Sequence, residues 1–334
     1  MNLRKIHIII IILLALSSCK VRTDSGGSPE EGHISIVRYD RLLTEYVTFN
    51  STSALQKLNT EHKHITKLLI EDVLSIGHVS EDRINEKLKA FYSDTTLLRV
   101  MNDIENRFPD LSDIEKELSK GFKNLHKEAP SIIIPQVYTQ ISALNESIVV
   151  GDSLLGISLD KYMGEEYPVY TNYFYDFQLK SMHPERIPSD CFVFYLLSEY
   201  PFPIEIGHNL LNVIIHYGKI NYIVKELLGY SSVDRVMGYT EDESKWLLEN
   251  RQKIWNYMVQ THHIHLRDPM LIRRYTGTVP YISQFGEDAP VQVGIWIGSQ
   301  IVSAYMKNNK KTTILDLLRM TDYSRMVEHT GYKP

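Results

Sequence analysis

The sequence predicts an α+β protein that is mostly helical, with a helical N-terminal layer, a small mixed sheet of about three strands and a C-terminal helix bundle. Apolar residues recur at helical spacing over residues 34–129 and again over residues 188–334. Between them, residues 130–160 are rich in β-branched residues and turn signals, which favours short strands. We expect residues 33–334 to form a single α+β domain.

The first 18 residues have the layout of a secretory signal. Arg4 and Lys5 precede an unbroken apolar run, Ile8–Leu16, which is shorter than the roughly 20 residues needed to span a bilayer. Small residues then lead to Cys19, as in a bacterial lipobox, where cleavage before the cysteine leaves an N-terminus that carries several acyl chains. An ordinary signal peptide with a chance cysteine is the alternative. We expect Cys19 to be lipidated and to attach the chain to a membrane.

Residues 19–32 form the predicted link between lipid and folded domain. After Cys19 they are polar and rich in Gly and Ser, which is typical of a flexible tether. Lys20, rather than an aspartate, follows Cys19, and no acidic run follows directly. These features favour the outer membrane, with the body of the protein facing the periplasm.

Composition excludes some partners. The formal net charge of −5 gives no basic footprint for nucleic acid, and an acidic surface is not drawn to anionic lipid. Cys19 and Cys191 are the two cysteines, so acylation of Cys19 leaves Cys191 without an intramolecular disulfide partner. Cys191 lies in an apolar run, where a buried, inert thiol is favoured over a nucleophile. We expect no cofactor.

Two helix starts are predicted in the N-terminal layer. Ser80 is placed to cap a helix that begins with acidic residues. Ser112 and Glu115 fit a capping box at the start of a helix that ends before Pro130. Alternating Glu and Lys on the outer faces indicate a solvated helical surface.

The predicted sheet begins after Pro130. Ser131–Ile141 is rich in β-branched residues, and Pro135 within it indicates an edge strand or a bulge. Ser147–Val150 and Leu154–Leu159 flank Gly151–Ser153, which indicates a hairpin with a three-residue loop.

Tyrosines crowd the segment that follows the sheet. At this density they would either form a platform for a carbohydrate or peptide, or pack the loop against the domain, and packing is the commoner outcome. The candidates for an interaction are Tyr162, Tyr167, Tyr170, Tyr173 and Tyr175.

Pro203–Gly229 is the longest apolar-periodic segment after the N-terminus, and we expect it to be a largely buried helix. Thr240–Glu243 is a second capping box, and Arg267–Ala289 is a long irregular segment. Gly294 and Gly298 lie four residues apart, which would place both on one helical face and let another helix approach closely.

His216–Ile220 occupies the place of an H-E-x-x-H zinc motif in the central helix. Of that motif only His216 remains, since Tyr217 would be a poor general base and Ile220 cannot bind a metal. A histidine packed within the bundle is therefore favoured over a metal ligand. A zinc-dependent hydrolase stays open as the alternative, with an acidic ligand supplied by Glu226, Glu243 or Glu249.

A second histidine cluster follows in the chain. Strand spacing would place His263 and His265 on one face as a weak two-ligand site, with His262 beside them. Because no cysteine or carboxylate pair completes the set, structural or surface histidines are favoured.

Several short motifs fall in an order that resembles the GldB family of gliding-motility lipoproteins of Bacteroidota. Together with the lipobox, they are Asp160–Gly164, Gly218–Tyr222, Gly238–Thr240, Trp246, Ile254–Trp255, Gly294–Gly298, Gln300–Val302, Tyr305–Met306 and Gly331–Pro334. The resemblance implies a cell-envelope lipoprotein associated with gliding motility and with machinery linked to type IX secretion. It implies no catalytic residue.

The family is also distantly similar to zincin-like proteins that carry H-E-x-x-H, which would make the fold a degenerate zincin. We therefore expect a non-enzymatic lipoprotein that acts through contacts with envelope proteins. The alternatives are a zinc hydrolase that uses His216 and a glycan-binding module that uses the tyrosine-rich loop.

Overall fold

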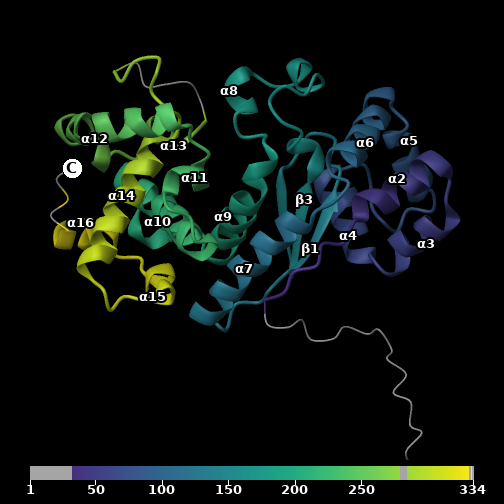
Figure 1. Ribbon diagram of the computed structural model, residues 1–334, viewed down its shortest axis with the longest axis horizontal. Helices are drawn as coiled ribbons and strands as arrows, with labels where there is room; N and C mark the ends of the chain where they lie inside the picture. The colour runs from purple at the N-terminus through teal and green to yellow at the C-terminus, as the bar shows by residue number, and fades with distance from the viewer. Residues whose placement is uncertain (1–31, 279–283, 331, 333–334) are drawn as a thin grey trace, which may run out of the picture. The chain divides into compact units, whose positions relative to one another are not determined.

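Helices make up most of the protein, and a small three-stranded sheet lies among them (Figure 1). The structure is a computed structural model, and it describes residues 32–278, 284–330 and 332. Cys19, the predicted signal and the predicted tether up to residue 31 lie outside the described residues. The predicted α+β class is confirmed, including the mixed sheet of three strands.

The N-terminal layer is helical, as predicted. Its helices are α2 (Tyr39–Phe49), α3 (Thr52–Thr60), α4 (Lys63–Lys67), the π-helix η1 (Leu68–Val73), α5 (Ile84–Tyr92), α6 (Thr95–Arg107) and α7 (Ser112–Glu128). Ser51 and Asp94 cap α3 and α6 through their side chains. The predicted cap at Ser80 is wrong, because α5 begins only at Ile84 and the carboxylate of Glu81 accepts the backbone N–H of His78 instead.

The capping box predicted at Ser112 is also wrong. Leu111 occupies the N-cap position of α7, and the Ser112 hydroxyl donates to Asp110 rather than bonding the first turn. Glu115 is used elsewhere, since its Oε1 accepts the backbone N–H of Ile36 at 2.7 Å. This carboxylate therefore fastens the N-terminal segment of the domain to α7.

The sheet has the order β1–β3–β2, with β1 (Gln136–Gln140) parallel to β3 (Leu154–Ser158) and β2 (Ile148–Gly151) antiparallel to it. Strand β1 begins just after Pro135, and Val37 forms an isolated parallel bridge with Tyr138 on its outer side. The hairpin loop has two residues rather than the predicted three, because Gly151 pairs with Leu154 and so belongs to the strand.

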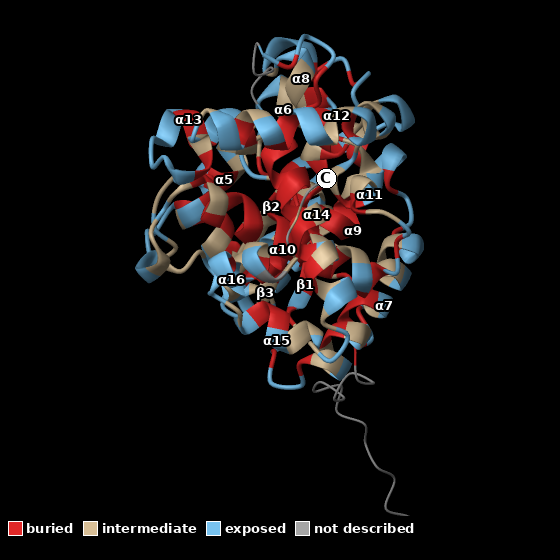
Figure 2. Cartoon of the chain, turned by 90° about the vertical axis from the view of Figure 1, so that its left-hand side faces the viewer, coloured by how far each residue is buried: buried red, intermediate tan, exposed pale blue. Residues whose placement is uncertain are grey.

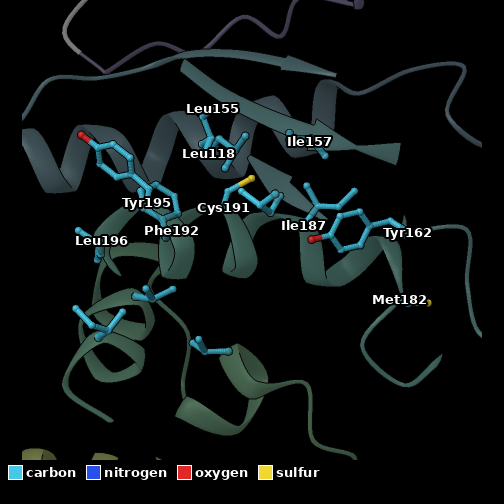
Figure 3. Close-up of a cluster of buried hydrophobic side chains, with 14 of the residues drawn as sticks. Leu118, Leu155, Ile157, Tyr162, Met182, Ile187, Cys191, Phe192, Tyr195 and Leu196 are labelled. Carbon is cyan, nitrogen blue, oxygen red and sulfur yellow. The ribbon is translucent and has the colours of Figure 1, made fainter. Parts of the chain in front are cut away.

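Helices α7 and α9 (Ile187–Glu199) connect the sheet with the C-terminal helices. Both contact α10, and α9 also packs on β2 and β3. Figure 3 shows Cys191, Phe192 and Tyr195 of α9 among buried side chains of α7 and β3. Cys191 is completely buried, and burial beside Asp190 raises the pKa of its thiol well above the ordinary value, as expected for an inert cysteine.

The central helix α10 (Leu210–Leu228) is shorter than the predicted Pro203–Gly229. Its first residues form instead a 3-10 turn, η5 (Ile204–Ile206), and Asn209 then caps α10 by accepting the N–H of Asn212 at 2.9 Å. Gly229 ends the helix in the left-handed conformation. Most of α10 is buried, as Figure 2 shows.

Helix α14 (Val293–Asn308) crosses α10 at backbone contact distance. A Cβ atom at Gly298 would overlap the carbonyl oxygen of Ile214, and one at Gly218 would overlap the backbone of Gly298. A Cβ at Gly294 would lie 2.8 Å from the Cβ of Tyr275. The predicted close approach at Gly294 and Gly298 is thus confirmed, and Gly218 is its counterpart on α10.

The remaining helices surround this crossing. They are η2 (Leu159–Lys161), η3 (Tyr170–Asn172), α8 (Asp176–Leu179), η4 (Pro184–Arg186), α11 (Val233–Met237), α12 (Glu241–Gln260), η6 (His263–His265), α13 (Pro269–Thr276), α15 (Ile314–Arg319) and α16 (Tyr323–Thr330). Within the described part of the chain, none of the helices combines the length and apolar character needed to cross a membrane.

Two predictions for this region have different outcomes. The capping box of Thr240 and Glu243 is confirmed, with both reciprocal hydrogen bonds present at the start of α12. The strand spacing assumed for His263 and His265 is wrong because these residues form a 3-10 turn, and the segment predicted as irregular contains α13, which Asp268 caps.

Candidate functional site

His216 lies at the middle of α10 and is 1% exposed. Its Nδ1 is 2.8 Å from the hydroxyl of Tyr323, which comes from the first residue of α16. Its Nε2 is buried and has no hydrogen-bond partner. Burial lowers the pKa of His216 to about 4, and the charge of nearby Lys219 adds to this shift, so the ring is neutral at physiological pH.

Lys219 lies one turn after His216 and is equally buried. Its Nζ donates to the carbonyl oxygens of Leu318 and Met320, at 3.1 and 3.0 Å, and to the Tyr323 hydroxyl at 3.2 Å. These carbonyls lie at the C-terminal end of α15, where helix oxygens lack intrahelical partners and carry partial negative charge. Since Tyr323 accepts from Lys219, its own proton is free to go to His216 Nδ1.

This chain of Lys219, Tyr323 and His216 joins α10 to α15 and α16. Among the described residues, no carboxylate lies within ion-pair distance of Lys219, and burial alone lowers its pKa to about 8. The three groups therefore act first as a polar connection between helices. The sequence could not reveal it, because Tyr323 lies 104 positions after Lys219.

The donor set around His216 does not suit a metal ion. Its Nδ1 is already bonded to Tyr323, and the Lys219 ammonium nearby would repel a cation. Glu226 pairs with Lys225, Glu243 accepts Thr240 N–H, and Glu249 is exposed on α12. In the part of the chain that the structure describes, no group of three or more His, Cys, Asp or Glu side chains is placed to hold a metal.

Lys219 should make stability depend on pH above neutrality. Its pKa falls from 10.5 to about 8 on folding, so between these values the unfolded chain binds more protons and the free energy of unfolding rises with pH. At about 1.4 kcal/mol for each pKa unit, we expect wild type to gain roughly 2 kcal/mol over Lys219→Met between about pH 7 and pH 9.5.

Urea unfolding of both proteins, followed by circular dichroism over this range, measures the gain. The comparison stops below the pH at which tyrosines in the unfolded chain ionise. A difference between the two proteins that stays constant with pH would show that folding does not lower the pKa of Lys219.

The tyrosine-rich loop is largely packed against the domain. Tyr162 donates to Asp190 at 3.0 Å, Tyr167 to Asp103 at 2.9 Å, and Tyr170 to the carbonyl of Asp160 at 2.7 Å, and all three rings are buried. Tyr173 and Tyr175 are instead 58% and 74% exposed. The predicted cluster thus divides into three side chains that hold the loop and two that remain available for contacts.

Asp160 organises the start of this loop. Its buried carboxylate accepts the backbone N–H groups of Ser142 and Leu144, at 2.9 and 2.6 Å. Burial raises its pKa, while these hydrogen bonds oppose the rise. The preceding residue Ala143 and Leu144 itself both have positive φ, so the carboxylate holds a strained turn beside β3.

A cavity of about 300 Å³ lies where this loop meets the C-terminal helices. Its lining comes from α8, α9, the end of α11 and the start of α12, and a wider groove of about 1250 Å³ shares Arg186 and Tyr239 with it. Lys180 and Glu243 form an ion pair of 3.0 Å at the boundary of the two. No local pattern in the sequence predicts this cavity, because its walls come from segments far apart in the chain.

The family comparison decides what kind of protein this is. The model of the family described as gliding motility protein GldB matches residues 21–334. The chain belongs to the GldB family. The resemblance inferred from the ordered motifs is therefore confirmed for this GldB-family chain.

Comparison of the GldB-family chain with curated proteins gives no match, and comparison with solved structures gives none either. The predicted likeness to zincin folds therefore stays a prediction.

Proposed function

We propose that this GldB-family lipoprotein is anchored through Cys19, faces the periplasm from the outer membrane and supports an envelope complex through protein contacts rather than catalysis. The family match supports a role in gliding motility and a lipoprotein anchor. The link to machinery of type IX secretion, the choice of membrane and the lipid on Cys19 are further parts of this proposal.

The hydrogen bonds made by His216 and Lys219 of the central helix α10 are the observation that best supports a non-enzymatic role. In a zinc hydrolase this part of the helix would carry the side chains that bind the metal. Here His216 is hydrogen-bonded to Tyr323, and Lys219 is hydrogen-bonded to Tyr323 and to carbonyl oxygens at the end of α15. Both side chains are buried and occupied in holding helices together. A hydrolase would have to break this connection to admit metal and substrate.

Exposed apolar side chains supply candidate contact points for partners. A soluble protein carries some of these singly without function, so their distribution must be tested by experiment. They occur on several elements, at Phe49, Ile133, Tyr175, Ile204, Leu248 and Met270.

In-cell photocrosslinking tests the contact role. Each of these six positions is replaced in turn by p-benzoylphenylalanine in the full-length lipoprotein, and intact cells are irradiated. We expect discrete protein adducts from one face of the molecule and none from the others, because a specific complex covers a limited surface. Mass spectrometry of the adducts identifies the partners.

The fully buried position Phe192 is the matched control and should give no intermolecular adduct. Absence of protein adducts at all six exposed positions, in a strain where the tagged protein restores the wild-type phenotype, would refute a function through protein contacts.

A further inference from the structure

The cavity between the tyrosine-rich loop and α12 has one charge that its own walls do not neutralise. Lys161, Lys180 and Arg186 are its cations, and Asp190 and Glu243 are its carboxylates. Glu243 is paired with Lys180, and Asp190 accepts Arg186 Nη2 at 2.6 Å. Lys161 is the third cation of the lining, and neither of these carboxylates pairs with it.

The surroundings of Lys161 leave its ammonium group available. Its Nζ donates to the carbonyl of Leu144 at 3.2 Å and lies 4.1 Å from the centre of the Phe174 ring. Asp160 and Glu146 attract it, but among the described residues no carboxylate is within 4.0 Å of its Nζ. The half-buried ammonium of Lys161 therefore has N–H donors that a bound carboxylate could accept.

Apolar side chains line part of the cavity, beside uncharged polar ones such as Gln178 and Gln292. Phe194 of α9 is 43% exposed although it is aromatic, and Phe177 and Met237 are half-buried beside the same space. Tyr175 extends this surface, since its ring stacks on that of Phe177 with centroids 5.6 Å apart and planes 8° from parallel. An apolar or aromatic side chain would fit between these walls.

The adjoining groove has the opposite charge. Its lining includes more carboxylates than cations. The acidic side chains concerned are Glu165, Glu185, Asp234, Glu241, Glu243 and Glu249. A ligand that lies across both spaces should therefore be negative at its tip and positive behind it.

We propose that the cavity and groove bind the C-terminal segment of a partner protein. The last residue of the segment is apolar and places its free carboxylate beside Lys161, while Lys or Arg residues upstream lie along the acidic groove. A volume of about 300 Å³ is at the lower end for ligand sites, which suits a chain that ends there rather than one that passes through. This assignment rests on the proposed role in protein contacts.

A glycan fits these walls less well. Sugar hydroxyls are commonly bound by free carboxylates, but Asp190 is bonded to Arg186 and Tyr162, and Glu243 to Lys180 and Thr240. The side-chain oxygen of Gln178 already accepts the backbone N–H of Tyr175. Among the cations of the lining, Lys161 has no carboxylate within 4.0 Å in the described part of the chain, and its ammonium together with the aromatic side chains matches the end of a peptide.

Affinity selection with synthetic peptides tests the proposal. Two random mixtures are made, one with free C-terminal carboxylates and one with C-terminal amides, and each is passed over the purified full-length lipoprotein in detergent. We expect the free-acid mixture alone to yield retained peptides, with apolar last residues and Lys or Arg upstream. Lys161→Met should weaken the retained peptides at least about tenfold, because their carboxylate loses its charged partner.

Two variants separate charge loss from damage to the fold. Lys161→Arg keeps the cation and should retain most of the binding, whereas Lys57→Met on α3 removes an exposed cation outside the cavity and groove and should have no effect. Thermal melting of all variants shows whether each remains folded.

Enrichment of acidic side chains from the amide mixture, or binding that survives Lys161→Met in folded protein, would overturn the assignment. The absence of any selected peptide would also overturn it. If no peptide were selected but muropeptides bound in a manner that depends on Lys161, the cavity would be assigned to a glycan. Photocrosslinks on another face together with a failed selection would refute only the cavity assignment and leave the contact role intact.

Discussion

Gly298→Ala should destabilise the protein by more than about 4 kcal/mol, an effect that few single substitutions reach. On an ordinary helix this change is favourable by roughly 1 kcal/mol, because alanine is the better helix former. Here the added methyl group would overlap the carbonyl oxygen of Ile214, so α10 and α14 would have to move apart along their buried crossing. Denaturant unfolding followed by circular dichroism measures the loss.

Ser303→Ala is the matched control, since Ser303 is an exposed residue of the same helix. A change there should stay within about 0.5 kcal/mol. If Gly298→Ala protein were as stable as the control, the two helices would not cross at backbone contact.

Cys19→Ala should release the protein from membranes. Several acyl chains on one cysteine bind a bilayer stably, whereas the described residues contain no helix able to cross it. We therefore expect the variant in the soluble fraction after salt washing, and in the aqueous phase when detergent phases are separated. Loss of incorporated radiolabelled fatty acid provides an independent measurement.

Cys191→Ala is the control for Cys19→Ala. Cys191 is buried in α9 and should carry no lipid, so its replacement should leave fatty-acid labelling and membrane association unchanged. Continued membrane association of Cys19→Ala protein after salt washing would show that something other than lipid on this residue attaches it.

The parts of the fold that depend on local pattern could be predicted from the sequence. Apolar periodicity located the helical layers, and the glycines at 294 and 298 indicated the helix crossing that the structure confirms. The capping box at Thr240 was predicted correctly, but the same pattern at Ser112 failed. It failed because a tertiary contact, from Glu115 to Ile36, took the side chain that the box required.

The candidate site could be predicted only in part. The sequence indicated His216 as the remainder of a metal motif. Its hydrogen bond to Tyr323, and the bond from Lys219 to the same hydroxyl, form only because α16 packs on α10. Likewise, the tyrosine cluster was visible in the sequence, whereas the burial that separates Tyr170 from Tyr175 was not. Long-range contacts of this kind have no local signal.

The crossing of α10 and α14 limits which sequences this fold can accept. At most buried positions, a larger side chain can be accommodated when a neighbouring side chain becomes smaller. At Gly218 and Gly298 the atoms in the way belong to the backbone of the opposite helix, which no substitution removes. Neither glycine can therefore be compensated by a second mutation nearby, and the pair should change only in lineages where the two helices have moved apart.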